Sequence, residues 1–273
     1  MTEFVSTTRG DRVAYDAHGE GPALVFVAGA GPFRAEDPVT TETARLAGEN
    51  GVTAVVFDRL GRGETETGGD ADLDAELGAL SALLEHVGGS AVLCGHSSGC
   101  SIALRAAAAG LPVDGLVLWE APVSAPAAET AEWASDFERQ VEDGDLEAAT
   151  ETYMRDMPPE WLAGAKASPA WPDIAASARS KVADAQSLAW ATAVLEDGSL
   201  ADDVKVPVVA VYGTETFPGM PEAAERIADA LPGATVAEVP GSGHSWEPEA
   251  MADVLVKFVR TATGSYEHPT GGV

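Results

Sequence analysis

One nine-residue stretch decides the fold: Ala91-Val92-Leu93-Cys94-Gly95-His96-Ser97-Ser98-Gly99 (AVLCGHSSG). Residues 91–94 form an apolar run typical of a strand that is buried on both faces. The Ala-rich residues 98–109 that follow are predicted to form a helix. Between strand and helix, the Gly-x-Ser-x-Gly pattern predicts a sharp turn that exposes Ser97. The flanking glycines are needed because such a turn brings neighbouring backbone too close for side chains.

The pattern of strand followed by helix recurs on both sides of this turn. Further strands are predicted over residues 23–28, 53–57, 116–119, 206–212 and 235–239, after a hairpin over residues 4–7 and 12–17. Helices are predicted over residues 39–50, 73–87, 222–231 and 248–261. Strands that alternate with helices imply a mostly parallel sheet covered on both faces. The sequence therefore predicts an α/β fold with an eight-stranded sheet.

The middle of the chain breaks this alternation. Residues 123–200 contain no convincing strand, but they contain several helical stretches and four of the six tryptophans: Trp133, Trp161, Trp171 and Trp190. We interpret this segment as a helical cap inserted into one α/β core that comprises residues 1–122 and 201–273. The tryptophans, with Met154 or Met157, are candidates for an apolar pocket.

Composition limits the partners that the protein can have. Sixteen basic residues stand against forty-four acidic ones, which gives a formal net charge of −28. Such a surface repels phosphate backbones and anionic lipids, so neither nucleic acid nor a membrane surface is expected as a partner. Cys94 and Cys100 form neither a disulfide framework nor a metal-ligand pattern. No signal peptide or membrane-spanning run is visible, and we expect a cytoplasmic protein. The oligomeric state is left open.

Ser97 is the candidate nucleophile, because it sits centrally between the two glycines where Ser98 does not. A serine hydroxyl needs a base to take its proton. His244 is the candidate base among the five histidines, since it follows the last predicted strand and precedes the final helix. A loop at this edge of the sheet can reach the turn at Ser97.

Four segments resemble the α/β-hydrolase superfamily over nearly the whole chain. They are the turn over residues 28–31, the loop over residues 58–63 (DRLGRG), the nucleophile elbow and the Gly243-His244 pair. The resemblance implies an α/β-hydrolase fold and a catalytic triad whose acid usually follows the seventh strand within Gly-x-x-Asp. Here that aspartate position holds Thr216, and Glu215 is one residue out of register.

Glu120 is the preferred acid. It ends the sixth strand, where haloalkane dehalogenases and some lipases of this superfamily carry their acid. A carboxylate after an apolar strand is also costly to bury without a partner. Glu215 remains the alternative. The oxyanion hole requires two N–H donors, and the resemblance points to the backbone N–H groups of Ala30 and Ser98, with Phe33 or Arg34 lining the pocket.

The sequence therefore predicts a serine hydrolase with a small-molecule substrate, most simply a carboxylic ester, and with no metal or organic cofactor. A lactone, a thioester or a carbon–carbon bond are alternative substrates, and a non-catalytic or slowly hydrolysing receptor on the same scaffold is an alternative function. A dinucleotide-binding site is disfavoured. Gly29-x-Gly31 lacks the third glycine of that fingerprint, and Pro32 interrupts the helix start.

Overall fold

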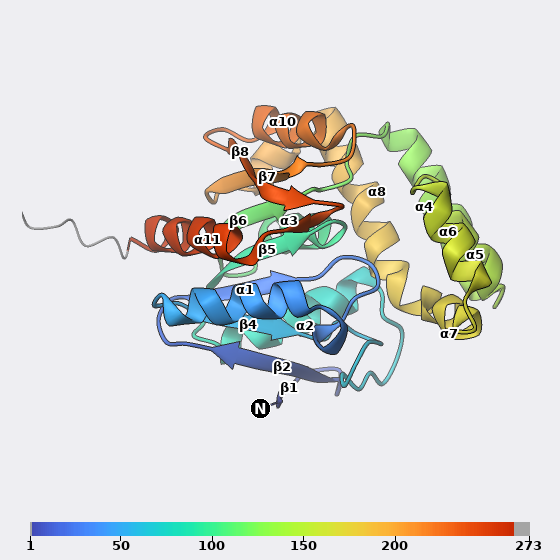
Figure 1. Cartoon of the computed structure of the whole chain (residues 1–273), viewed down its shortest axis with the longest axis horizontal. Helices are drawn as coiled ribbons and strands as arrows, with labels where there is room; N and C mark the ends of the chain where they lie inside the picture. Colours follow the sequence, from blue (N-terminus) through green and yellow to red (C-terminus); the bar gives the residue numbers. More distant parts are fainter. Residues whose placement is uncertain (1, 265–273) are drawn as a thin grey trace, which may run out of the picture.

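A single sheet organises the molecule, for which a computed structural model describes residues 2–264. Its strands are β1 (Glu3–Ser6), β2 (Arg12–His18), β3 (Ala23–Val27), β4 (Thr53–Phe57), β5 (Ala91–His96), β6 (Val113–Trp119), β7 (Val208–Glu215), β8 (Thr235–Ser242) and β9 (Ser245–Trp246). They lie side by side in the order β1-β2-β4-β3-β5-β6-β7-β8-β9 (Figure 1). Strands β3 to β8 are parallel, whereas β1, β2 and β9 pair antiparallel with their neighbours.

The predicted number of eight strands is wrong by one. The additional strand, β9, has only two residues and pairs with the end of β8. Prediction ended β8 at Val239 because Pro240 and Gly241 follow, and such residues usually end a strand. In the structure Gly241 pairs with Trp246, so the strand continues to Ser242. Pairing with β9 on one side and with β7 on the other therefore overrides the local signal.

The apolar runs of the parallel strands are explained by burial on both faces. Successive side chains of a strand point to opposite faces, so Val25 joins one hydrophobic cluster and Leu24 the other. One face is covered by α1 (Pro38–Glu49) and α11 (Pro248–Ala262), the other by α2 (Leu73–His86), α3 (Gly99–Ala108) and α10 (Met220–Ala230). Helix α1 begins at a proline after Asp37, whose side chain accepts a hydrogen bond from Thr40 N.

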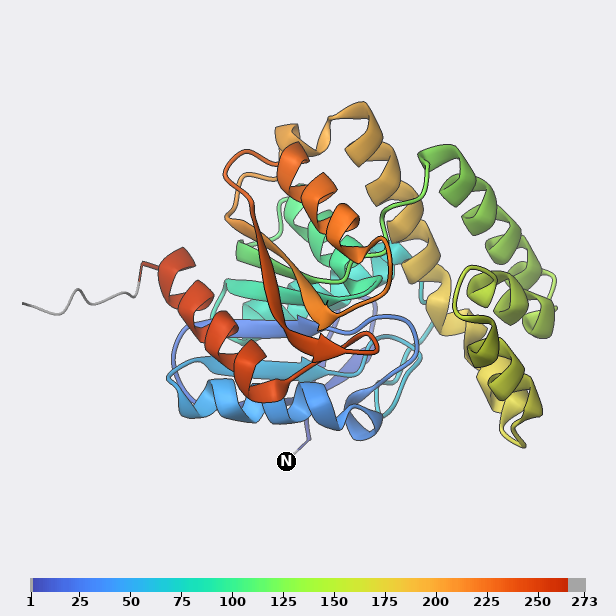
Figure 2. The same cartoon turned by 45° about the horizontal axis from the view of Figure 1, so that its top comes forward.

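Only helices lie between β6 and β7 in the described chain. They are α4 (Ala127–Glu142), α5 (Leu146–Met154), α6 (Pro159–Ala167), α7 (Trp171–Ala176), the 3₁₀ helix η2 (Ser177–Lys181), α8 (Val182–Asp197) and α9 (Leu200–Asp203). Helix α8 packs on α3, and α4 packs on α8. Helices α4 to α7 therefore stand beside the sheet, with α8 between them and the core (Figure 2).

Candidate active site

Backbone strain marks three residues of the chain. Ser97, Glu120 and His244 have φ angles of 54°, 48° and 73°, and no other non-glycine residue between 2 and 264 has a positive φ. Ser97 directly follows β5, Glu120 directly follows β6, and His244 lies in the turn between β8 and β9. Each such conformation costs about 1–3 kcal/mol and persists only where the surrounding structure enforces it. The three residues predicted as nucleophile, acid and base are therefore the three strained ones.

The turn at Ser97 forms because its neighbours have no side chains in the way. A Cβ on Gly95 would lie 2.6 Å from Cys100 Cα, and one on Gly99 would lie 2.1 Å from Val27 O. The Ser97 N–H donates to Trp119 O at 2.9 Å, which ties the turn to the end of β6. Ser97 is half-buried, whereas the adjacent Ser98 is buried.

Glu120 and His244 are in direct contact. Glu120 Oε2 lies 2.5 Å from His244 Nδ1. The other carboxylate oxygen, Oε1, accepts hydrogen bonds from Gly213 N at 3.0 Å and from Thr216 Oγ1 at 2.5 Å. Glu215 is exposed at the end of β7, and its side chain makes no hydrogen bond or ion pair with any described residue. The structure thus places Glu120, and not Glu215, beside the histidine.

Thr216 has a function that the sequence did not reveal. It occupies the position where the superfamily usually carries its acid, and it donates a hydrogen bond to Glu120, the predicted acid. Burial raises the pKa of Glu120, but the hydrogen bonds from His244, Thr216 and Gly213 outweigh it and lower the pKa below its ordinary 4.5. Glu120 is therefore a carboxylate at neutral pH, and it orients the Nδ1–H of His244.

Two side chains donate hydrogen bonds to the backbone of His244. Its carbonyl accepts hydrogen bonds from His96 Nε2 at 2.9 Å and from Trp119 Nε1 at 3.3 Å. Burial and the nearby His244 lower the pKa of His96 to about 4, so His96 is neutral and uses Nε2–H as the donor. The rings of His96 and His244 have centroids 4.9 Å apart. His96, the second residue of the elbow motif, thus helps to hold the backbone of His244, the predicted base.

Ser97 Oγ makes no hydrogen bond with the residues described, His244 included. Its Cβ instead lies against the loop after β3, since a Cβ on Gly29 would be 2.8 Å from Ser97 Cβ. The backbone N–H groups of Ala30 and Ser98, predicted as oxyanion-hole donors, make no hydrogen bond to a protein acceptor within residues 2–264. Two free N–H groups beside the nucleophile can bind an anionic oxygen.

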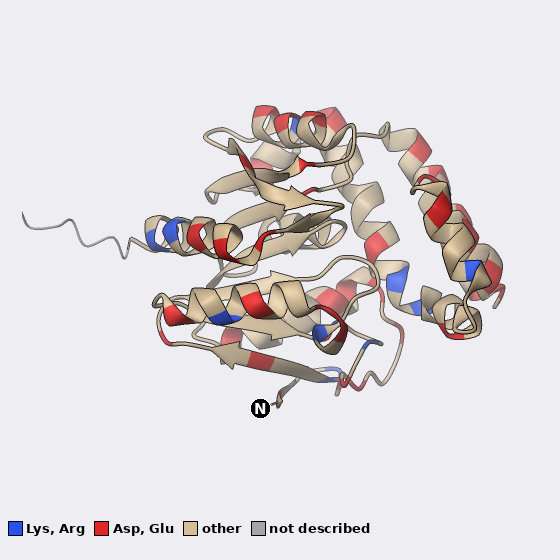
Figure 3. Cartoon of the chain, viewed as in Figure 1, with Lys and Arg blue, Asp and Glu red and all other residues tan. Residues whose placement is uncertain are grey.

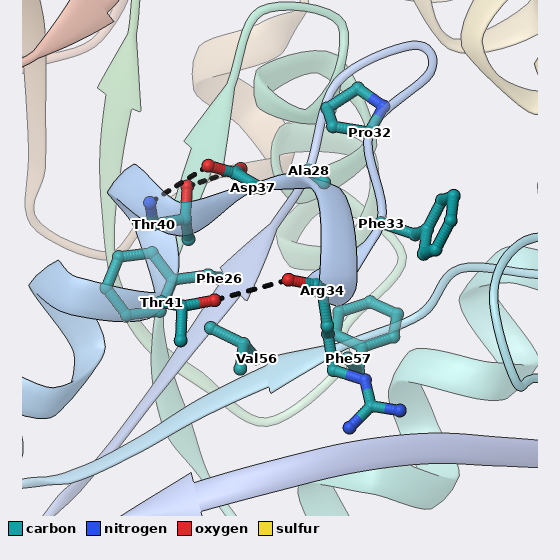
Figure 4. Close-up of a pocket in the computed structure, with 10 residues that line it drawn as sticks. All are labelled: Phe26, Ala28, Pro32, Phe33, Arg34, Asp37, Thr40, Thr41, Val56 and Phe57. Carbon is teal, nitrogen blue, oxygen red and sulfur yellow. Dashed lines mark hydrogen bonds between the residues drawn. The ribbon is translucent and has the colours of Figure 1, made fainter.

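A small cavity lies behind this loop (Figure 4). Its volume is about 20 Å³, enough for about one water molecule, and Phe33 and Arg34 contribute to its lining. Arg34 pairs with Asp16, Asp58 and Glu64, so its guanidinium is occupied within the fold. The cavity is too small for an organic substrate. Residues 2–264 also contain no cluster of three His, Cys, Asp or Glu side chains placed to hold a metal ion.

Comparisons with known proteins agree with this architecture. The profile of the Alpha/beta hydrolase family matches residues 24–257. An alpha/beta hydrolase from Sphaerobacter thermophilus is 26% identical, with a TM-score of 0.72 over 94% of this chain and 99% of its own. A thermophilic esterase from Thermogutta terrifontis is 20% identical, with a TM-score of 0.64 over 97% and 98%.

An enol-lactonase from Burkholderia xenovorans is 16% identical, with a TM-score of 0.58 over 96% of this chain and all of its own. At such identities the two latter structures are similar in fold alone. No curated protein matches the sequence significantly. The family profile spans most of the chain, from β3 into α11, and this chain therefore belongs to the alpha/beta hydrolase family.

Proposed function

We propose that this alpha/beta hydrolase is a serine hydrolase that cleaves a small-molecule acyl bond, a carboxylic ester in the first instance. The observation that supports the proposal is that the backbone strain and the carboxylate–histidine contact fall on the same three residues. Ser97, Glu120 and His244 alone among the described non-glycine residues have a positive φ, and two of them share a 2.5 Å hydrogen bond. Strain of this kind concentrates at functional sites.

The proposed mechanism gives each of these groups one role. Ser97 Oγ attacks the acyl carbon while His244 Nε2 takes its proton, and Glu120 stabilises the resulting imidazolium. The Ala30 and Ser98 N–H groups bind the oxyanion of the tetrahedral intermediate. The ester C–O bond breaks, the alcohol leaves with the proton from His244, and an acyl-enzyme remains. Water, deprotonated by His244, then attacks the acyl-enzyme and releases the acid and the free serine.

The nucleophile favours acyl transfer over other reactions of the superfamily. Dehalogenases and epoxide hydrolases attack with a carboxylate, whereas this elbow carries a serine hydroxyl. Lactones, thioesters and carbon–carbon bonds beside a carbonyl would react through the same oxyanion. An ester is the simplest substrate that uses every group described.

Aromatic side chains connect the inserted helices to His244. The Phe217 ring, after β7, lies 6.0 Å from the ring of His244, and Trp161 of α6 packs edge-on against Phe217 at 5.7 Å. Trp161 is 41% exposed. Trp133 instead stacks on Phe137 inside the inserted segment and is a core residue. Trp161 and Phe217 thus provide an apolar surface beside the base, which favours an apolar group in the substrate.

Reaction with a fluorophosphonate probe and turnover of p-nitrophenyl esters test the proposal together. The wild-type protein should be labelled at Ser97 and should hydrolyse at least one ester of the series. Ser97→Ala should lose both, whereas Ser101→Ala, a buried serine of α3, should keep both. A folded wild-type protein that is neither labelled nor active near neutral pH would support the receptor instead.

A further inference from the structure

A buried cluster of charges lies behind the oxyanion loop, and the mechanism above does not use it. Arg59 and Arg62 follow β4, Glu76 lies on α2, and Asp184 lies on α8 of the inserted segment. All four are at most 5% exposed. Asp184 pairs with Arg59 at 2.6 Å and with Arg62 at 2.8 Å, and Arg59 also pairs with Glu76 at 3.2 Å. We call these four residues the arginine–carboxylate cluster.

Burial of so many charges is expensive and gives little net stability. Burial raises the pKa of Asp184, but Arg59 and Arg62 outweigh it and hold the pKa below its ordinary 3.8. Asp184 is therefore ionised and pairs with two guanidinium groups, whereas burial raises the pKa of Glu76. Apolar residues of similar size would hold α8 on the core at lower cost. A role other than stability explains the buried charges better.

The two arginines donate hydrogen bonds to the loop that carries Ala30, the first predicted oxyanion donor. Arg62 Nη1 donates to Gly29 O at 2.5 Å, and Arg59 Nη1 donates to Ala28 O at 3.0 Å. The Gly29 carbonyl and the Ala30 N–H belong to one planar trans peptide, so they point in opposite directions. A guanidinium that fixes the carbonyl therefore also fixes the direction of the N–H. A charged donor on the carbonyl further polarises the peptide and strengthens its N–H.

The same cluster reaches the second donor. Ser98 Oγ donates to Asp184 Oδ1 at 2.7 Å, and this serine is 2% exposed. The Ser98 N–H is the other predicted donor of the oxyanion hole. Asp184 thus contacts Ser98, which supplies the second donor. It also contacts Arg59 and Arg62, which bind the loop that supplies the first donor.

We propose that Asp184, Arg62 and Arg59 are positioning residues that align both N–H donors of the oxyanion hole. Helix α8 of the inserted segment then helps to position the oxyanion hole, in addition to packing on α3. Its side chain at residue 184 links the loop after β3 to the elbow after β5, two segments of the core that lie beside each other. The inference rests on the proposed function, because it presupposes an oxyanion at Ser97.

Arg62→Met is the primary test, because it keeps an apolar stem and removes the guanidinium that donates to Gly29 O, Ser180 O and Asp184. With p-nitrophenyl butyrate, kcat should fall about 10²-fold, the size of effect seen when one oxyanion donor is lost, and KM should change by less than about threefold. A trifluoromethyl ketone adds to Ser97 as an oxyanion, so its affinity should fall by the same factor as kcat/KM. The pH profile should be unchanged, since Glu120 and His244 are untouched.

Arg226→Met is the matched control. Arg226 also donates to backbone carbonyls, Val123 O at 2.6 Å and Ala125 O at 3.2 Å. These carbonyls lie outside the oxyanion loop, and Arg226 does not belong to the arginine–carboxylate cluster. Its kcat and its affinity for the ketone should match the wild type. If both arginine variants lose activity equally, the effect is a general loss of stability and the inference is overturned.

Ser98→Ala decides the question if Arg62→Met does not fold. It keeps the N–H and removes only the bond to Asp184, so kcat and ketone affinity should fall together by about tenfold. Unchanged values in a folded variant, or a rise in KM alone, would overturn the inference while leaving the proposed function intact. A wild-type protein without ester turnover and without labelling at Ser97 would overturn both.

Discussion

At the scale of single residues, the site depends on a glutamate that is held by four neighbours. Glu120 is bent into a positive φ, it is buried, and its two oxygens are bonded to His244, Thr216 and Gly213. Val211 is the fourth neighbour, since the Glu120 N–H donates to Val211 O at 2.8 Å. A carboxylate this constrained can fix one tautomer and one orientation of its histidine.

Replacement of Glu120 should lower kcat far more than replacement of Glu215, the alternative acid. Glu120→Gln should lower kcat about 10²–10⁴-fold, because an amide cannot stabilise the imidazolium and can present an N–H to Nδ1. Glu215→Gln, at the exposed end of β7, should change kcat by less than about twofold. Steady-state kinetics on one p-nitrophenyl ester measures both. The reverse order would assign the acid to β7.

Thr216→Val should make stability depend less on pH. The lowered pKa of Glu120 means that its ionised form stabilises the fold above the ordinary value of 4.5 and that this stabilisation is lost as the pH falls through the lower, folded-state pKa. Removal of the Thr216 donor should reduce the free energy of unfolding by about 1–2 kcal/mol at pH 7 and by less at pH 4. Urea unfolding at the two pH values measures the difference.

Thr214→Val is the control for this experiment. Thr214 lies on β7, two residues before Thr216. Its Oγ1 donates to Gly241 O of β8 at 3.3 Å, and no titratable group takes part in that bond. Its loss of stability should be equal at pH 7 and pH 4. An equal loss at both pH values for Thr216→Val as well would contradict the role assigned to that hydroxyl.

At the scale of elements, the elbow between β5 and α3 requires glycine for steric reasons. Gly99→Ala should destabilise the protein by more than about 3 kcal/mol or prevent folding, because the new Cβ would lie 2.1 Å from Val27 O in the neighbouring strand. Gly78→Ala, within α2, meets no atom within 4 Å and should instead stabilise by about 0.5–1 kcal/mol. Thermal unfolding of the two variants tests the contrast. Equal melting temperatures would contradict the crowding at the elbow.

At the scale of the whole molecule, negative charge predominates. Acidic side chains occupy the helices beside the sheet and the outlying helices α4 to α6, and basic ones are few (Figure 3). No helix among the described residues is both long and apolar enough to cross a membrane. Long-range repulsion should slow the approach of an anionic substrate.

This field predicts a substrate preference that depends on salt. An anionic ester, p-nitrophenyl hemisuccinate, should have a kcat/KM that rises about three- to tenfold between 10 mM and 300 mM NaCl, because salt screens the repulsion. The kcat/KM of the neutral p-nitrophenyl butyrate should stay within about twofold over the same range. A flat salt dependence for both esters would show that the net charge does not act at the site.

Local patterns in the sequence determined the order of strands and helices, the elbow and the candidates Ser97 and His244. Buried strands, flanking glycines and helix spacing are properties of neighbouring residues, so they are visible without coordinates. The strand β9 was missed because two residues carry no periodicity. Its existence depends on a partner strand that turns back through Gly243-His244.

Only the tertiary structure decided which carboxylate contacts His244 and what holds the oxyanion loop. Glu120 and His244 are 124 positions apart, and Ser98 and Asp184 are 86 apart, so no local pattern relates them. The position of Thr216 indicated that the usual acid was absent, but not that its hydroxyl would support the replacement. Asp184 carries no motif at all. Its significance comes from the fold, which packs α8 against the core and buries that carboxylate between two arginines.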